Sequence, residues 1–213
     1  QPCSSAASDV YKRQLYYTVT ESIKRNLPVE LALLPFIESQ FDPYAQSSTG
    51  ASGIWQFILS TAREQKLKKN WWYDGRRDIV ASTDAAFNYL TKLHNKYDDW
   101  LLAIAAYNAG PNRILKEIKK NKEKGLSTDF WSLKLPRETK AYVPKLLALL
   151  EVIKSPEKFS VVIPNLPNRP YFQLVTLPSQ VDLMQVANIS GLKLEVIYEL
   201  NPGFNQWATD PNG

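Results

Sequence analysis

Apolar and polar positions along the chain alternate with a helical period over most of its length. Apolar residues recur every three or four positions, which predicts helices that pack one face on a core. The predicted helices cover residues 15–25, 29–37, 60–66, 78–96, 99–108, 113–122 and 141–153. A chain with this pattern is expected to be mainly α.

Proline and glycine mark where several of these helices begin and end. Gly110 and Pro111 follow the helix predicted at 99–108, in the order that closes helices. Pro28 suits the first turn of the helix at 29–37. Pro35, inside that helix, is expected to bend it without breaking it.

The pattern changes after residue 158. Prolines punctuate residues 159–170, where the helical period is lost, so this stretch is predicted to be an extended linker. Residues 171–177 alternate between apolar and polar and predict a strand. Two helices are expected beyond it, one from a Ser179 cap to Ile189 and one at 194–200. Residues 171–213 should therefore form a small α+β appendage.

Composition narrows the class of protein. The 213 residues leave room for one domain with a sizeable core and a small appendage. The single cysteine, Cys3, excludes an internal disulfide framework. Cysteine and histidine are not clustered with metal-ligand spacing, so neither a metal nor another cofactor is expected. His94, the only histidine, lies among polar neighbours and is assigned to the surface. The sequence contains no apolar run of the length that a membrane span requires.

Positive charge is concentrated in one region. Residues 113–158 hold twelve Lys or Arg and six Asp or Glu, a surplus of +6 in a chain whose net charge is +5. A basic flank favours an anionic polymer through long-range attraction. Residues 116–124 mix both signs as a solvated helix face does, and no nucleic-acid motif is present, so nucleic acid is not an expected partner.

Residues 1–14 do not continue the pattern of the rest. They lack an initiator methionine and a hydrophobic signal core. The segment resembles translated cloning sequence, so we treat it as a non-native leader and exclude it from the fold expectations. A native export signal or lipid anchor is then expected to be missing.

Glu38 is the strongest candidate for a catalytic residue. It ends the apolar run 29–37 and precedes a glycine-rich turn at 50–56. A carboxyl held against apolar surface loses hydration, which raises its pKa, as a general acid near neutral pH requires. Asp42 is the second acid close by, but Pro43 after it suggests a turn in which aspartate bonds its own backbone.

Four short motifs in order resemble the catalytic core of the lytic transglycosylases and goose-type lysozymes. They are Glu38-Ser39, the Gly-Ile-Trp-Gln of 53–56, the Ala-Tyr-Asn-Ala-Gly of 106–110, and Tyr142. The Gly-Ile-Trp-Gln motif, and the blocks at 73–78, 128–133 and 138–145, are typical of the D branch of the membrane-bound members. The resemblance covers about residues 27–158.

The resemblance implies a lysozyme-like helical domain, here over 15–158, that acts on peptidoglycan glycan strands in the periplasm or cell envelope. Any membrane contact would come only through the missing N-terminal anchor. One glutamate, Glu38, would cleave the β-1,4 bond between MurNAc and GlcNAc without water, giving 1,6-anhydroMurNAc ends. Two alternatives stay open: a hydrolytic lysozyme, and a non-catalytic wall-binding protein.

The resemblance also assigns substrate-binding roles by position. The residues concerned are Ser39, Ser47, Trp55, Gln56, Tyr107, Asn108 and Tyr142. Trp55 and Phe57 offer flat faces for sugars but are equally suited to core packing. Trp71, Trp72 and Trp131 are expected in the core or the cleft wall.

The appendage at 171–213 resembles a degenerate and truncated LysM carbohydrate-binding module. Its expected strand, helices and Asn-Pro-Gly exit at 201–203 match that module, whereas Pro178-Ser179-Gln180 replaces the usual Gly-Asp-Thr. The sequence leaves open whether this segment binds glycan or caps the catalytic domain.

Overall fold

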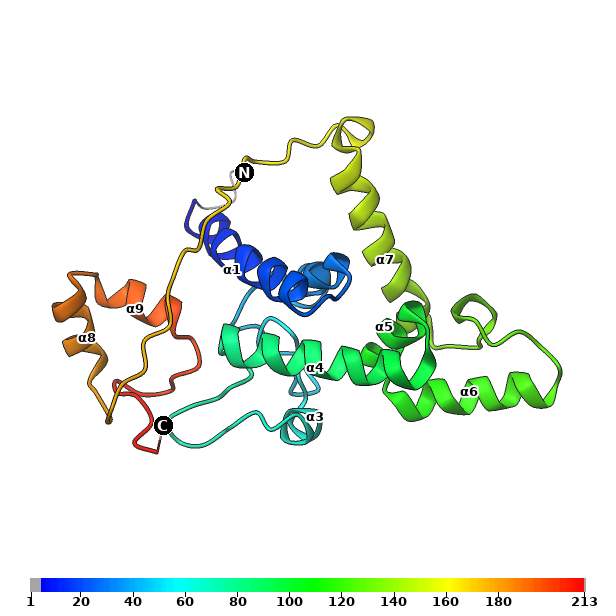
Figure 1. Cartoon of the computed structure of the whole chain (residues 1–213), viewed down its shortest axis with the longest axis horizontal. Helices are drawn as coiled ribbons and strands as arrows, with labels where there is room; N and C mark the ends of the chain where they lie inside the picture. The colour runs from blue at the N-terminus through cyan, green and yellow to red at the C-terminus, as the bar shows by residue number, and fades with distance from the viewer. Residues whose placement is uncertain (1–4, 213) are drawn as a thin grey trace. The chain divides into compact units, whose positions relative to one another are not determined.

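The computed structural model describes residues 5–212, and side chains from residue 14 onward, so Cys3 lies outside the described residues. Its fold is mainly helical, as predicted (Figure 1). The α-helices are α1 (Ser5–Lys24), α2 (Leu34–Glu38), α3 (Leu59–Glu64), α4 (Ile79–Tyr97), α5 (Trp100–Ala109), α6 (Pro111–Glu123), α7 (Arg137–Lys154), α8 (Leu183–Ser190) and α9 (Leu194–Leu200). Short 3-10 helices are η1 (Val29–Leu33), η2 (Phe130–Ser132) and η3 (Pro156–Phe159).

The described residues fall into two compact units, and each has its own packed interior. The first consists of the residues up to Ala86 and those from Leu166 onward. Its buried apolar residues come from η1, α2, the 41–57 loops and the start of α4. They include Leu31, Ala32, Leu34, Phe41, Ile54, Trp55, Phe57, Ile79 and Ala85.

The second unit covers residues 87–165 and is built around α5. Leu102 to Ala106 are all buried, and α5 packs on α6 and α7. Asp99 starts α5, because its side chain accepts a hydrogen bond from Leu102 N at 3.0 Å. Gly110, with φ of 87°, ends α5 as the sequence predicted. Pro111 begins α6 immediately, two residues before the predicted start at residue 113.

Pro35 divides the helix that was expected at residues 29–37. Residues 29–33 form the 3-10 helix η1, and α2 starts anew at Leu34 with Pro35 in its first turn. Proline has no N–H to donate to the preceding turn, and the first turn of a helix is where that loss is tolerated. Where the sequence predicted a bend, the structure changes from a 3-10 helix to an α-helix.

The end of the chain differs from its prediction in one element. Residues 171–177 are extended, but none of them belongs to a strand. Alternating polarity makes a strand possible, yet a strand also requires a paired neighbour, and the described residues supply none to this segment. The structure thus lacks the expected strand at 171–177 and holds two helices in the appendage.

These two helices have their own small core. Asp182, and not Ser179, caps α8, since its carboxylate accepts from Met184 N at 2.7 Å. Gly191, with φ of 69°, ends α8 as predicted, and α9 has the predicted bounds. Leu183, Ala187 and Ile197 are buried between the helices, with Phe204 packed against them.

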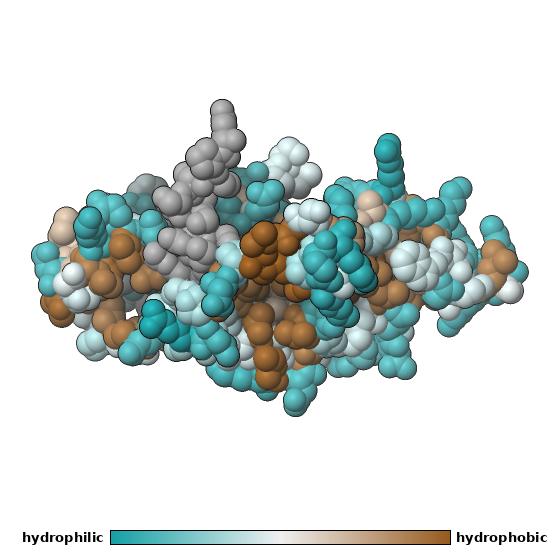
Figure 2. Space-filling view, turned by 90° about the horizontal axis from the view of Figure 1, so that it is seen from above, coloured by the Kyte–Doolittle hydropathy of each residue, from teal (hydrophilic) through white to brown (hydrophobic). Residues whose placement is uncertain are grey.

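The described surface is mostly hydrophilic on the face that Figure 2 presents, and hydrophobic residues form separate patches on it. Among residues 5–212, no helix has the length and apolar character to cross a membrane. The described side chains also include no cluster of three or more His, Cys, Asp or Glu arranged for a metal ion.

Candidate functional site

Glu38 is the last residue of α2 and is half-buried. The chain turns sharply after it, because Gln40 and Phe41 both adopt positive φ angles, of 56° and 61°. Such angles are uncommon for residues other than glycine and are often found at functional sites. The Pro35 carbonyl accepts from Ser39 N and Phe41 N at 3.0 and 3.1 Å, which fixes the turn beside Glu38.

Ser39 ties this turn to the loop that carries the Gly-Ile-Trp-Gln motif. Its hydroxyl donates to the Ile54 carbonyl at 3.0 Å. Ile54 is fully buried, so the bond lies at the edge of the core. Glu38 and the 53–56 motif, which are distant in sequence, are therefore held at adjacent positions in the first unit.

Asp42 has the local role that its Pro43 neighbour predicted. Its carboxylate accepts a hydrogen bond from Tyr44 N at 2.9 Å, and the residue is exposed. This is an Asx turn, in which the side chain takes the place of a backbone acceptor. The second acid near Glu38 is thus engaged by its own loop.

Ser47 and Gln56 close the two ends of the glycine-rich turn. The Ser47 hydroxyl accepts from Ala51 N at 3.0 Å and contacts the Thr49 hydroxyl at 2.9 Å. The Gln56 amide donates to the carbonyls of Ala45 and Gly53, at 3.2 and 2.9 Å. Gln56 has a positive φ of 51°, so backbone and side chain together fix its position.

Trp55 lies in the core and not at the surface. Its exposed fraction is 0%, and its indole N–H donates to the Thr83 hydroxyl at 3.0 Å. Phe57, at 3%, is also buried. Of the two readings that the sequence left open for Trp55, the structure supports core packing, because a fully enclosed ring has no face to offer a sugar.

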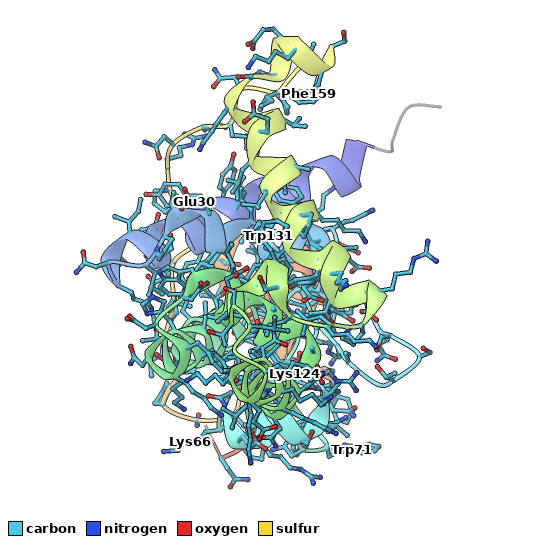
Figure 3. All side chains as sticks on the ribbon, turned by 90° about the vertical axis from the view of Figure 1, so that its right-hand side faces the viewer. Glu30, Lys66, Trp71, Lys124, Trp131 and Phe159 are labelled. Atoms are coloured by element: carbon cyan, nitrogen blue, oxygen red, sulfur yellow. The ribbon has the colours of Figure 1, made fainter. Side chains whose placement is uncertain are left out.

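The other tryptophans were expected in the core or the cleft wall, and their exposed fractions bear on the first of these two positions. Trp71 and Trp131 are 71% and 61% exposed, so neither belongs to the core (Figure 3). Trp72 is half-buried and meets Trp207 edge to face, with ring centroids 5.7 Å apart. His94 is half-buried and stacks on Trp100 at 4.0 Å, which fits a structural role at the surface of the second unit.

The second unit groups its predicted site residues on α5 and α7. Asn108 lies near the end of α5, where its side-chain carbonyl accepts from the Thr139 hydroxyl at 2.8 Å. Its amide donates to the Glu138 carboxylate at 3.4 Å. Tyr142 follows Thr139 by one turn of α7 and is 5% exposed. Tyr107, beside Asn108, is half-buried with its ring 5.7 Å from that of Tyr89.

The predicted site residues therefore form two groups. Glu38, Ser39, Ser47 and Gln56 surround the 38–57 turns of the first unit, with Trp55 in the core behind them. Tyr107, Asn108 and Tyr142 form the other group, on α5 and α7 of the second unit.

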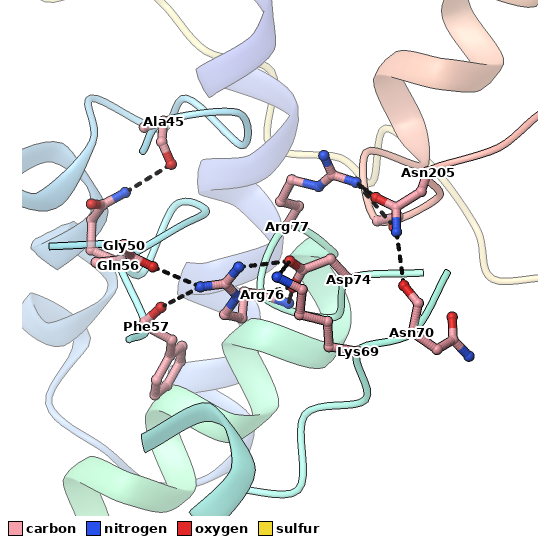
Figure 4. Close-up of polar contacts among 12 residues, drawn as sticks. Ala45, Gly50, Gln56, Phe57, Lys69, Asn70, Asp74, Arg76, Arg77 and Asn205 are labelled. Atoms are coloured by element: carbon pink, nitrogen blue, oxygen red, sulfur yellow. Dashed lines mark hydrogen bonds and ion pairs between the residues drawn. The ribbon is translucent and has the colours of Figure 1, made fainter. Parts of the chain in front are cut away.

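Two residues of the 73–78 block, to which the sequence analysis gave no role, support the first group. Arg76 and Asp74 form a buried ion pair, with Nη2 to Oδ2 at 2.7 Å, in the loop beside the glycine-rich turn (Figure 4). Burial disfavours a charged Asp74, yet the hydrogen bonds and charge of Arg76 outweigh that effect and lower its pKa. An arginine two residues after an aspartate was the available signal for this pair.

Two family models match the chain. One is described as the transglycosylase SLT domain and matches residues 16–130. The other is described as the LysM-like domain of lytic transglycosylase MltD and matches residues 171–213, hereafter the LysM-like segment.

Curated relatives and a solved structure agree with these matches. Membrane-bound lytic murein transglycosylase D of Escherichia coli K12 is 47% identical over 190 residues, covering 89% of this chain and 42% of that protein. A putative tributyltin chloride resistance protein of Alteromonas sp. is 42% identical, covering 76% of this chain and 77% of its own length. An inactive mutant of lytic transglycosylase Slt from Pseudomonas aeruginosa aligns with a TM-score of 0.50 and 26% identity, covering 67% of this chain and 24% of that one.

The chain spans about two fifths of the first of these relatives, or 42% of its length. The SLT model nevertheless covers more than half of the chain, and it includes the first three of the four motifs on which the resemblance rested. The predicted resemblance is confirmed: this chain belongs to the transglycosylase SLT domain family and carries a LysM-like segment of the MltD type.

Proposed function

We propose that this protein is a lytic murein transglycosylase that cleaves the β-1,4 bond between MurNAc and GlcNAc and releases 1,6-anhydroMurNAc ends. Membership of the SLT domain family supports the reaction class. The names of similar proteins contain the words membrane-bound and murein, which supports murein as the substrate and the cell envelope as the location. A lipid anchor preceding residue 15 would complete that assignment.

Glu38 is the proposed general acid and base. Its carboxylic acid protonates the departing glycosidic oxygen as the bond from that oxygen to C1 breaks. The carboxylate then takes the proton of the C6 hydroxyl of MurNAc, whose oxygen closes onto C1 and forms the anhydro ring. Glu38 is then protonated again, as it was at the start, and no water has been consumed.

The observation that supports a single-acid mechanism is the hydrogen bond that the Asp42 carboxylate accepts. This residue is exposed, and its carboxylate is held by Tyr44 N in its own turn. Conventional glycosidases need two carboxylates placed across the scissile bond. We therefore assign both proton transfers to Glu38, and an intramolecular hydroxyl gains from proximity where water lacks a second base.

The supporting roles follow from what each side chain bonds. Ser39 and Ser47 brace the turns, and the two amide bonds of Gln56 fix its side chain in the glycine-rich turn. We assign Tyr107, Asn108 and Tyr142 to substrate binding from their match to the family motifs. The Trp55 side chain is buried and is left out of the contacts with substrate.

Replacing Glu38 by glutamine tests the assignment. Glu38→Gln keeps the shape and hydrogen-bonding capacity of the side chain but cannot transfer the proton. We expect turnover of purified peptidoglycan to fall by the ~10²–10⁴-fold typical of general acid–base catalysis, with the circular dichroism spectrum and melting temperature unchanged. Glu64→Gln, at the exposed end of α3, is the matched control and should keep wild-type turnover.

Mass spectrometry of the released muropeptides tests the reaction type in the same samples. A lyase product ends in 1,6-anhydromuramic acid and is lighter by one water than a hydrolysed product. Asp42→Asn should leave product identity and most of the activity intact. Reducing-end products that disappear in Asp42→Asn would contradict the proposal in favour of a hydrolytic lysozyme.

A further inference from the structure

The loop at residues 68–78 is approached closely from two sides. On one side, a β-carbon added at Gly53 would lie 1.8 Å from the Arg76 carbonyl oxygen, so only glycine fits. On the other side, a β-carbon added at Gly203 would lie 2.6 Å from the Tyr73 ring. The loop thus lies between the turn that carries Gln56 and the LysM-like segment.

Arg76 joins this loop to the two ends of the glycine-rich turn. Its Nη1 donates to the carbonyls of Gly50 and Phe57, at 2.8 and 3.3 Å (Figure 4). Its Nε and Nη2 donate to the two carboxylate oxygens of Asp74, at 3.0 and 2.7 Å. Arg76 is 4% exposed, so water does not compete for these bonds, and a planar guanidinium can make all of them at once.

The LysM-like segment holds the other side of the same loop through backbone bonds. Asp74 N donates to the Gly203 carbonyl at 2.8 Å, and Asn205 N donates to the Trp72 carbonyl at 2.8 Å. The Asn205 side chain donates to the Asn70 carbonyl at 3.2 Å and accepts from Arg77 (Figure 4).

Ion pairs and ring contacts reinforce these backbone bonds. Asp210 accepts from Lys68 at 2.9 Å, and Phe204 packs on Tyr73 with ring centroids 5.5 Å apart. The segment is therefore fastened to the loop by charge, backbone and aromatic contacts together.

We infer that Arg76 is a positioning residue for the turn at 50–57, and that the LysM-like segment supports this turn by holding the Asp74–Arg76 loop. The turn carries Gln56, and its Ile54 carbonyl receives the Ser39 hydroxyl next to Glu38. The effect on turnover rests on the proposed function. The effect on the turn itself does not.

Amide hydrogen exchange of the turn provides a readout that does not depend on activity. The N–H groups of residues 51, 52, 53 and 56 are hydrogen-bonded inside the first unit. Their exchange rates therefore report local opening of the turn. Arg76→Lys keeps the charge beside Asp74 but cannot reproduce the fork and the two carbonyl bonds. Asn205→Ala removes the side-chain contacts from the opposite side of the loop. Asn188→Ala, at an exposed position of α8, is the matched control.

We expect these four amides to exchange faster in Arg76→Lys and in Asn205→Ala, with the amides of α5 in the second unit unchanged. Turnover of peptidoglycan should fall by up to about 10²-fold, as small misplacements at an active site can cause. Asn188→Ala should match the wild-type protein in both measurements.

Unchanged exchange at the turn in Asn205→Ala, or an equal increase in Asn188→Ala, would overturn the inference. If Arg76→Lys does not fold, Asn205→Ala decides alone, since its side chain is exposed and its loss leaves the Asp74–Arg76 pair complete. If the two variants exchange faster at the turn but the wild-type protein shows no turnover of peptidoglycan, the proposed function is refuted. The positioning role of Arg76 would then still hold.

Discussion

Trp55 and Trp71 are the same residue type in opposite surroundings, with exposed fractions of 0% and 71%. Both lie within residues 27–158, which the resemblance covers. Burial depends on long-range packing, here of the 53–57 turn against Thr83 of α4. Glu38 could be selected from the sequence because the order of the motifs pointed to it. The exposure of each tryptophan could not be predicted in this way.

The Asp74–Arg76 pair makes stability dependent on pH. The pKa of Asp74 is lower in the folded chain than in the unfolded one, where a carboxyl titrates near about 3.9. Its contribution is therefore complete above that pH and is lost as the pH falls through the folded value. The pKa of Asp129 is lowered to about 2, chiefly by hydrogen bonds from Ser127 and Ser132, and this acts in the same direction.

We expect the free energy of unfolding, measured with urea, to fall as the pH is lowered from 5 to 2. Asp74→Asn should lower the free energy at pH 5, because Arg76 would remain buried without its counter-charge, by about 3–5 kcal/mol. The same variant should lose less stability than the wild-type protein on acidification. If the free energy of unfolding falls with pH equally in both proteins, Asp74 does not contribute to the pH dependence.

At the scale of elements, helices with explicit end signals were predicted most closely. Asp99 and Gly110 located α5 to within one residue at each end, and α9 was predicted over the observed residues. The start of α6 was predicted two residues late. Elements that depend on a distant partner were not predictable. The expected strand at 171–177 is the clearest case, since local alternation cannot supply a neighbouring strand.

The Asp99 cap of α5 can be tested by one substitution. Asp99→Ala removes the acceptor for Leu102 N, which we expect to lower the free energy of unfolding by ~0.5–2 kcal/mol. Asn95→Ala, at an exposed position of α4, should change it by less than about 0.5 kcal/mol. Equal effects of the two substitutions would mean that the cap does not limit the stability of α5.

At the scale of the whole molecule, the order of the motifs predicted the family, and the linker at 159–170 stays a prediction. A cap on the catalytic domain was one of the two roles left open for the LysM-like segment, but its packing on the 68–78 loop was not predicted. It depends on Asn205, Phe204 and Asp210 meeting a loop more than a hundred residues earlier, as in the Asn70–Asp210 hydrogen bond with a sequence separation of 140. No local pattern encodes such a contact.

Deleting residues 171–213 distinguishes a support from an independent glycan-binding module. The deletion removes the contacts that Gly203, Asn205 and Asp210 make with the 68–78 loop. If the segment is a support, the loop then loses one of its two attachments. We therefore expect a lower melting temperature and weaker cleavage of short soluble glycans, together with faster amide exchange at residues 51–56. An independent module would instead leave the melting temperature and the cleavage of soluble glycans unchanged, and would weaken only the sedimentation of the protein with insoluble sacculi. Because soluble glycans are too short to need a second binding site, their cleavage rate is the measurement that separates the two roles.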